Sequence, residues 1–496
     1  MTVLLQIGRR PPDPDPAPAP SPGGHPVPAD RPLPGAVPDV VPGAAAEARL
    51  FHSAHGAHLF VVDGSRVYDL PGDVEGQVRS WLDSGDASEL GPGARAALGL
   101  EPGASRRIDG RPIDPPPLSA LSLNVMQACN MSCAYCYADE GRFGGAARVM
   151  PREVAFAAVD RLLADSRPGA DVVVGFMGGE PLLAADLVHE VTAYAARAAE
   201  AAGRRARFSL TTNLTELRPA DARLFARYPF AVSVSLDGDR DRNDALRRLP
   251  GGASAYDRVR AGLDLLARHG RPRHLAARVT VTPAGGRLLD VLDHVIGLGF
   301  DEVGFAAVVA SPDPALEFTG PQFEGFLAHM VECGEVALRE LAAGRRYPFG
   351  NFETAMAQIH RGSHRPYPCG AGAGYLSAAA NGDLFACHRL VDDPGFAMGS
   401  VTAGPDQAAR AEHLARGHVD RMSPCRSCWA RYLCGGGCYH EVARRGRPGC
   451  DYIRGWLAFC LRAYVELSAA RPDYFEGLPA SSGYGGSGSD PTTVAR

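Results

Sequence analysis

Six short apolar segments alternate with amphipathic helical patterns between residues 118 and 310, and this alternation constrains the fold more than any other feature of the sequence. Helical patterns such as residues 151–166 and 255–270 separate the segments. Regular strand–helix alternation predicts an α/β fold with a parallel sheet, and six units predict a partial (β/α)6 barrel whose active site lies at the C-terminal ends of its strands. The expected strands are residues 120–126, 171–177, 206–212, 231–236, 276–282 and 302–308.

The ends of the 496-residue chain differ in texture from its centre. Residues 1–47 are rich in Pro and Ala and residues 479–496 in Gly and Ser, so we expect a disordered leader and a disordered tail. Residues 48–112 begin with two apolar strands around an Asp-Gly-Ser turn and continue as helical pieces. This pattern fits either a small winged-helix-like peptide-recognition module or a structural N-terminal cap.

The barrel is expected to occupy residues 113–330, followed by linker helices over residues 331–364. Cysteine and glycine then become frequent over residues 365–478, and regular periodicity weakens. Such a texture predicts a C-terminal domain that metal sites hold together because its own core is thin.

Composition excludes several classes of protein. All 51 basic residues are arginine, so neither a phosphate-loop lysine nor a lysine Schiff base is available. A net charge of −5 argues against nucleic acid as the main partner. No apolar run reaches the roughly 18 residues that span a bilayer, and the N-terminus is a poor signal peptide. We therefore expect a cytoplasmic protein without a membrane partner, in which clustered reduced thiols bind metal.

Three cysteines stand directly after the first expected strand: Cys129, Cys133 and Cys136, spaced C-x3-C-x2-C. A structural zinc site is closed by four ligands. Three thiolates suit a [4Fe-4S] cluster with one open iron, because cysteine thiolates hold such clusters. Three buried thiols, or a zinc site completed by a distant residue, are the alternatives.

A second motif, Gly178-Gly179-Glu180-Pro181, follows the second expected strand. Adjacent glycines let a ligand approach the backbone closely, and a carboxylate beside them can pair with an ammonium group. Taken alone, such a motif is more often a simple turn than a site. It gains weight because the same edge of the sheet carries the three cysteines.

These two motifs together resemble the radical S-adenosylmethionine (SAM) enzymes. The resemblance implies that the three cysteines hold a [4Fe-4S] cluster whose open iron binds SAM, and that the GGEP motif contacts the SAM amino group. It also makes Ser235, at the end of the fourth strand, and Arg278, on the fifth, candidate SAM contacts. Asn213 is a weaker candidate, because related enzymes usually have glycine where this chain has Leu214.

The C-terminal cysteines resemble the SPASM domain of radical SAM peptide maturases, which carries two auxiliary [4Fe-4S] clusters. The resemblance assigns Cys369, Cys387 and Cys438 to the first auxiliary cluster, for which no fourth cysteine is evident; Cys333 lies on a helical pattern. Either Cys450, which we favour, or Cys460 would complete the second cluster. Its other ligands would be Cys425, Cys428 and Cys434. Zinc ribbons are the rival interpretation.

The motifs look most like those of thioether-forming maturases, which join a cysteine sulfur to a carbon of another residue in a ribosomally made peptide. The implied partners are a precursor peptide and an external electron donor of the flavodoxin or ferredoxin type. A sulfatase-type formylglycine maturase is the first alternative, although such enzymes usually have aspartate where this chain has His388. A carbon–carbon crosslinking maturase and a zinc-stapled peptide-binding adaptor are the others. The sequence does not assign a catalytic base among Asp237, Glu180 and Tyr135.

Overall fold

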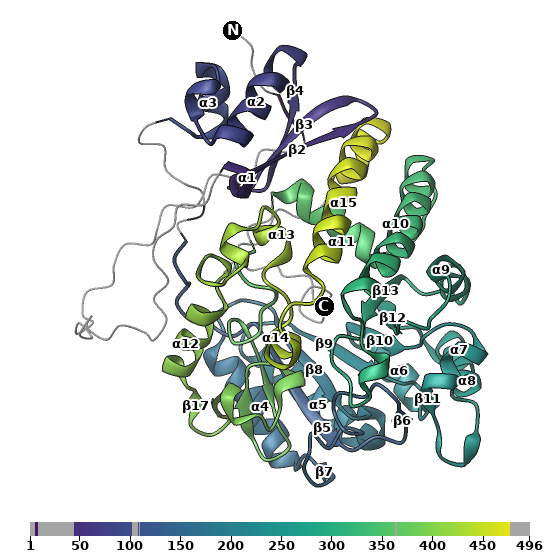
Figure 1. The fold of residues 1–496 in the computed structure, drawn as a ribbon. Coiled ribbons are helices and arrows are strands. Elements are labelled where there is room, and N and C mark those ends of the chain that lie inside the picture. Colours follow the sequence, from purple (N-terminus) through teal and green to yellow (C-terminus); the bar gives the residue numbers. More distant parts are fainter. Residues whose placement is uncertain (1–4, 8–43, 102–107, 109, 363–364, 477–496) are drawn as a thin grey trace, which may run out of the picture.

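The computed structural model describes residues 5–7, 44–101, 108, 110–362 and 365–476, and these form three packed parts (Figure 1). An N-terminal sheet with helices lies at one end of the molecule, the α/β barrel at the other, and the cysteine-rich C-terminal part beside both. Within the described ranges, no helix has the length and apolar character needed to cross a membrane.

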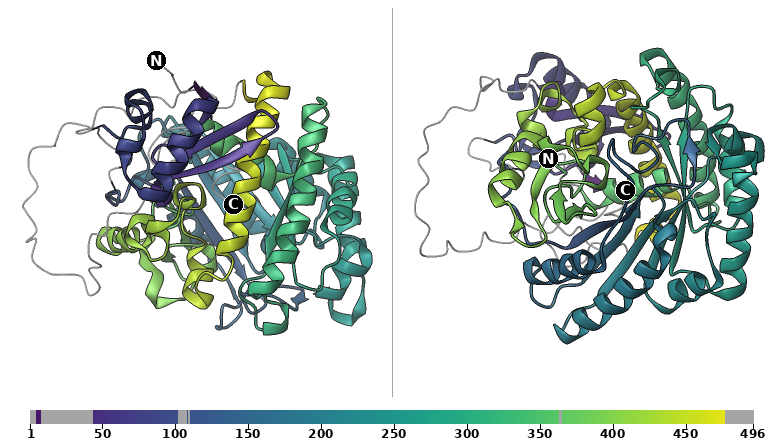
Figure 2. Two further views of the ribbon diagram at one scale, coloured as in Figure 1. Left: turned by 45° about the horizontal axis from the view of Figure 1, so that its top comes forward. Right: turned by 90° about the horizontal axis from the view of Figure 1, so that it is seen from below.

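Six parallel strands form the barrel sheet and pair with one another in chain order. Each begins and ends within two residues of the sequence prediction, which is therefore confirmed. Figure 2 (right) shows the strands fanning in an arc with helices along its outer side. The strands are β5 (Ala120–Gln127), β8 (Val172–Gly178), β9 (Ala206–Thr212), β10 (Phe230–Ser235), β12 (His274–Val281) and β13 (Glu302–Ala307).

The barrel core lies between the sheet and its outer helices. Alternate residues of β10 show why: Phe230, Val232 and Val234 are buried, whereas the intervening Ser233 and Ser235 are only half-buried. Because successive strand side chains point to opposite faces, the apolar set packs under the helices and the polar set lines the inside of the arc. The outer helices are α4 (Arg152–Asp165), α5 (Ala185–Ala201), α6 (Pro219–Arg227), α8 (Ala255–His269) and α9 (Leu288–Gly297).

The C-terminal part continues the barrel sheet, which the sequence did not indicate. Strand β14 (Tyr375–Ala378) pairs in parallel with β5, opposite β8, and three short antiparallel strands extend the sheet beyond it. These are β15 (Asp383–Phe385), β16 (Ala397–Ser400) and β17 (Gly404–Pro405). The strand that leads to the first cysteine motif therefore has the C-terminal part as its other neighbour.

Helices connect and cover this region. The expected linker helices are α10 (Gly320–Ala342) and α11 (Gly350–Arg361); α10 begins before residue 331 because Thr319 and Gln322 form a capping box. The long α15 (Cys450–Ala470) packs against α10. Three shorter helices complete the part: α12 (Gln407–Gly417), α13 (Arg431–Cys434) and α14 (Tyr439–Arg445).

The N-terminal module contains the expected hairpin, preceded by one more strand and followed by two helices. Strands β2 (Ala48–Ser53), β3 (Gly56–Val61) and β4 (Arg66–Leu70) are antiparallel, and α2 (Gly72–Ser84) and α3 (Pro92–Leu98) follow. Trp81 and Leu59 belong to a separate small core. This arrangement fits the winged-helix-like outline expected from the sequence.

Two segments assigned to the disordered leader are ordered, which corrects that expectation. Residues Leu5–Ile7 form strand β1, which pairs with the free edge of β4, and Ala44–Glu47 form helix α1. The edge of an antiparallel sheet accepts any extended apolar segment that can complete its hydrogen bonds, which explains why strand β1 forms. Buried Arg431 holds helix α1 in place, because it donates a hydrogen bond to the Ala46 carbonyl and forms an ion pair with Glu47 at 2.8 Å. Residues 8–43 and 479–496 lie outside the described ranges.

Candidate active site

The three cysteines of the first motif lie in the loop that directly follows β5. Burial first, and then the nearby Glu180, Cys133 and Cys136, raise the pKa of Cys129 to about 12. Burial also raises the pKa of Cys133. The three thiols therefore lie in one another's electrostatic field, and deprotonating them together requires a cationic group that binds all three.

A buried ion pair beneath this loop is the main feature that sequence reasoning missed. Residues Ser132–Cys133 form strand β6, which pairs with β11 (Arg247–Arg248), so that Arg247 lies opposite Cys133. The Arg247 guanidinium donates to both carboxylate oxygens of Asp237, at 2.9 and 3.2 Å, and Tyr135 donates to the same carboxylate at 2.5 Å. The pair fixes the loop, and an arginine some ten residues after the "SLDG" strand end is its only sequence signal.

The two glycines of the second motif lie against the backbone of the cysteine loop. A Cβ at Gly178 would lie 2.2 Å from the Met126 carbonyl oxygen, and one at Gly179 would lie 2.3 Å from that of Ala128. Gly179 and Glu180 also donate backbone hydrogen bonds to these two carbonyls. The glycines therefore admit the backbone of the cysteine loop, and a contact of Gly178 and Gly179 with SAM stays a prediction.

Glu180 itself is buried at the base of the loop. Its carboxylate accepts hydrogen bonds from Thr212 Oγ1 at 2.7 Å and from the backbone nitrogens of Asn213 and Leu182 at 2.6 and 2.9 Å. Burial nevertheless raises its pKa to about 7. A carboxylate held in this way is prepared for a cationic partner, which would lower that pKa. Pro181 starts the short 3₁₀ turn that follows.

Asn213 and Leu214 form the adjoining loop after β9. Asn213 Nδ2 lies 3.8 Å from Cys129 Sγ and 2.9 Å from Asn130 Oδ1. Leu214 has a φ of +61°, a left-handed conformation that glycine adopts most easily. Leu214 tolerates it while buried, in van der Waals range of Gly262 of α8, where a Cβ would be only 2.7 Å from Leu214 Cγ.

Ser235 and Arg278 lie opposite each other on neighbouring strands, in register between β10 and β12. Gly304 of β13 is the next residue in the same row, and a Cβ there would lie 3.1 Å from Arg278 Nη1. The row faces the inside of the arc, on the polar side of the sheet. These two candidate residues are therefore together, at the same end of the sheet as the cysteine loop.

Each of the three candidate bases, Asp237, Glu180 and Tyr135, already takes part in hydrogen bonds within the protein. Asp237 accepts four hydrogen bonds, from Tyr135, twice from Arg247 and from the Thr280 backbone nitrogen. Glu180 accepts three, as described above. Tyr135 donates to Asp237, and burial raises its pKa well above its ordinary value. Asp237 and Tyr135 therefore help to hold the cysteine loop, and Glu180 is fixed at its base.

A second group of three thiols, Cys369, Cys387 and Cys438, gathers in the C-terminal part beside the barrel. Burial raises the pKa of Cys369 to about 11 and that of Cys387 to about 12, and each thiol lies in the field of Cys438. Cys333 is elsewhere: it is fully buried in α10 within the main apolar core. The structure thus brings together the three cysteines that the resemblance assigned to one group.

A third group combines Cys425, Cys428 and Cys434 with Cys450. Burial raises the pKa of Cys434 to about 11, with further contributions from the other three thiols. Cys460 is fully buried on α15, and burial alone raises its pKa. Of the two candidates, Cys450 is therefore the one beside the group. In the described part of the chain, no group of three or more Cys, His, Asp or Glu side chains has the arrangement that holds a single metal ion.

Tyr137 stands between the first and second groups of thiols. Burial raises the pKa of its phenol, and Cys387, Cys136 and Cys438 all contribute to that increase. Tyr137, the residue directly after Cys136, therefore lies in the electrostatic field of thiols from both groups. His388 also faces this region: its Nδ1 lies 3.0 Å from Tyr375 Oη, which in turn lies 2.8 Å from Ser122 Oγ on β5.

A model of the radical SAM superfamily matches residues 123–287, which contain the cysteine loop, Glu180, Ser235 and Arg278. The barrel is a radical SAM domain. The chain is accordingly an enzyme, and residues 123–287 belong to a superfamily that is defined by its use of SAM and a [4Fe-4S] cluster. Three mutually close thiols without a fourth, next to a buried carboxylate, suit such a cluster and the amino group of SAM.

Proteins similar to the whole radical SAM region include two serine-type anaerobic sulfatase-maturating enzymes. That of Klebsiella aerogenes is 25% identical over 67% of this chain and 82% of its own length, and that of Bacteroides thetaiotaomicron is 28% identical over 68% and 87%. An uncharacterized protein of Archaeoglobus fulgidus is 24% identical over 67% of this chain and 78% of its own length.

The fold also resembles a solved structure described as native anSMEcpe with bound AdoMet. The TM-score is 0.60 at 18% identity, over 72% of this chain and all of the other. This likeness shows that the two proteins share a fold over that part of the chain.

Proposed function

We propose that this radical SAM enzyme modifies a ribosomally made peptide and most favourably forms thioether crosslinks between a cysteine sulfur and a carbon atom. The observation that carries the proposal is the pair of three-thiol groups on either side of Tyr137. One group belongs to the radical SAM domain and the other to the C-terminal part, so a peptide between them would be within reach of both.

In this proposal Cys129, Cys133 and Cys136 hold the cluster that binds SAM, and Glu180 receives the SAM ammonium group. Ser235 and Arg278 would contact the rest of SAM, Arg278 through its carboxylate. Bound there, the cluster and SAM would supply a radical that removes a hydrogen atom from the peptide. The chain's own contribution is to orient these groups through the Arg247–Asp237 pair and to hold the reacting parts together, which removes the entropic cost of an encounter.

Cys369, Cys387 and Cys438 would bind a first auxiliary cluster and leave one coordination position for a substrate cysteine. Cys425, Cys428, Cys434 and Cys450 would bind a second, closed one. The support is that the structure gathers three thiols in one case and four in the other. A substrate thiolate held in the open position would lie next to the site of hydrogen removal.

Formylglycine formation is the second candidate function. The two sulfatase-maturating relatives favour it. The residue type of His388 argues against it: burial, and then Arg389, His440 and Arg278, lower the pKa of this imidazole to about 3, so it stays neutral. An imidazole that stays neutral here would not replace a negatively charged base.

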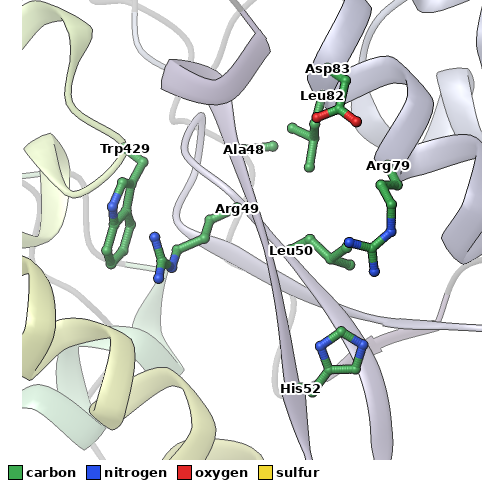
Figure 3. Close-up of a pocket in the computed structure, with 8 residues that line it drawn as sticks. All are labelled: Ala48, Arg49, Leu50, His52, Arg79, Leu82, Asp83 and Trp429. Atoms are coloured by element: carbon green, nitrogen blue, oxygen red, sulfur yellow. The ribbon is translucent and has the colours of Figure 1, made fainter.

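The N-terminal module offers a place for the rest of the peptide. Edge strand β2 and helix α2 line an open cavity of about 370 Å³ (Figure 3). Trp429 of the C-terminal part also lines it. Arg49 reaches from β2 to place its guanidinium carbon 4.6 Å from the centre of the Trp429 ring, and Arg79 and His52 line the same cavity. An extended, acidic peptide segment that adds a strand to β2 would suit these features.

The decisive experiment uses a short cysteine-containing open reading frame next to the gene. Its peptide is co-expressed with the enzyme and analysed by tandem mass spectrometry. A thioether predicts the loss of two hydrogen atoms, missing fragments between the joined residues and no reaction with an aldehyde reagent. Fragmentation throughout the peptide together with reaction at one aldehyde would replace this proposal with formylglycine formation.

An external reductant tests the chemistry without any peptide. Anaerobically reconstituted enzyme with dithionite and SAM should release 5′-deoxyadenosine. Protein that binds iron but releases none of this product would contradict the enzyme's assignment as a peptide maturase.

A further inference from the structure

Arg389 contacts the sulfur atoms of two of the three thiols in the second group. Its backbone nitrogen donates to Cys387 Sγ at 3.5 Å, and its guanidinium Nη1 donates to Cys438 Sγ at 3.6 Å. One residue thus supplies both a backbone dipole and a full positive charge to this group.

Neighbouring side chains fix the guanidinium in this position. The same Nη1 forms an ion pair with Glu441 at 2.8 Å, and the guanidinium carbon lies 4.5 Å from the centre of the Tyr137 ring. The side chains of Arg389 and Glu441 are each only 24% exposed, so solvent screens their charges weakly.

We propose that Arg389 is a positioning residue that raises the reduction potential of the auxiliary cluster bound by Cys369, Cys387 and Cys438, with Glu441 opposing it. This inference rests on the proposed ligand assignment. Reduction adds one negative charge to the cluster and its thiolates. A nearby cation and two N–H donors stabilise the reduced state more than the oxidised state, because hydrogen bonds to the sulfurs and local charge set such potentials.

The test is a potentiometric titration of the reconstituted full-length protein, followed by electron paramagnetic resonance. Cys129, Cys133 and Cys136 are all changed to Ala, so that only the auxiliary clusters report. A further Cys438→Ala change identifies the signal of the first auxiliary cluster by its loss. Arg389→Gln, Arg389→Lys and Glu441→Gln are then compared in this background. The matched control is Arg444→Gln, because Arg444 is a more exposed arginine nearby that pairs with Asp393 at 3.4 Å.

Arg389→Gln should make reduction of that cluster about tenfold less favourable. Its reduction potential should therefore fall by about 59 mV, the one-electron equivalent of a tenfold change in the equilibrium constant. Glu441→Gln should raise it, because the carboxylate that offsets the cation is lost. Arg389→Lys should fall between Arg389→Gln and the parent, and Arg444→Gln should match the parent. Opposite signs for Arg389→Gln and Glu441→Gln are the essential result.

Potentials of both variants within the range of the control would overturn the inference, and so would shifts in the same direction. A Cys438→Ala protein that keeps its full iron content and every signal would overturn it as well, because the cluster would then not be bound there. No peptide is needed, so a failure of the crosslinking assay leaves this result unaffected. Iron content and circular dichroism of each variant identify any that fails to fold, in which case Arg389→Lys and Glu441→Gln carry the test.

Discussion

Arg247 and Asp237 form a buried, two-point ion pair directly beneath the cysteine loop of the radical SAM domain. The guanidinium Nε and Nη2 lie 2.9 and 3.2 Å from the two carboxylate oxygens, and the side chains are 8% and 0% exposed. The pair joins the end of β10, through Asp237, to the strand that lies antiparallel to Cys133. Its position makes the loop's conformation depend on this pair, because Arg247 Nη1 also donates to Cys133 Sγ at 4.0 Å.

Arg247→Ala should therefore destabilise the loop and the fold together. Removing one partner leaves a buried carboxylate uncompensated, at a cost of about 3–5 kcal/mol. The melting temperature and iron content of the reconstituted protein measure both effects. Arg248→Ala is the matched control, because the side chain of this neighbour in β11 is exposed. Equal iron content and melting temperature in the two variants would contradict this role of the ion pair.

Glu180 should make the stability of the cofactor-free protein depend on pH. Its pKa in the folded state is about 7, above its ordinary value of 4.5, so the folded protein binds more protons between these values. The associated stability is complete below about pH 4.5 and is lost as the pH rises to about 7, on the order of 3 kcal/mol. Glu180→Gln removes this dependence.

The measurement is the free energy of unfolding in urea from pH 5 to pH 8 for both proteins. The difference between the parent and Glu180→Gln should change with pH in this interval. A difference that stays constant would show that the carboxyl group does not titrate there. Adding SAM to reconstituted enzyme should release protons near pH 7, and Glu180→Gln should abolish the release.

Gly179→Ala should disturb the cysteine loop through backbone contact. The new methyl group would meet the Ala128 carbonyl oxygen at 2.3 Å, and because that atom is backbone, the loop must move. We expect a destabilisation of about 1–3 kcal/mol or more and loss of iron from the radical SAM domain. Gly76→Ala in α2 is the control, since nothing lies within 4 Å of its Cβ and it should stabilise the helix by about 0.5–1 kcal/mol.

Cys450→Ala and Cys460→Ala should separate a cluster ligand from a core thiol. Cys450→Ala is expected to remove about four iron atoms per chain, because it takes away one thiolate of a closed four-cysteine cluster. Cys460→Ala should keep all of its iron and lose only packing energy in α15. Quantifying iron and acid-labile sulfide in both variants checks the assignment, and the reverse pattern would transfer the ligand role to Cys460.

The sequence predicted the barrel because its evidence is local. The two-residue alternation in β10 and the apolar runs of β5 and β8 are properties of consecutive residues, and strand length follows from them directly. The same holds for the spacing of Cys129, Cys133 and Cys136 and for their place after the first strand. The family of the barrel followed from these motifs, and the match over residues 123–287 confirmed it.

Only the tertiary structure showed which distant residues meet. The pairing of β14 with β5, separated by some 250 residues, brings the C-terminal thiols to the barrel. The Arg247–Asp237 pair, the contact of Arg389 with two sulfurs and the position of Cys450 beside Cys434 are likewise long-range. The GGEP glycines show the limit most clearly: the sequence indicated that something approaches closely, and the fold decided that it is the backbone of the cysteine loop. Periodicity and spacing determine local structure, whereas the choice of partners depends on how complete surfaces pack.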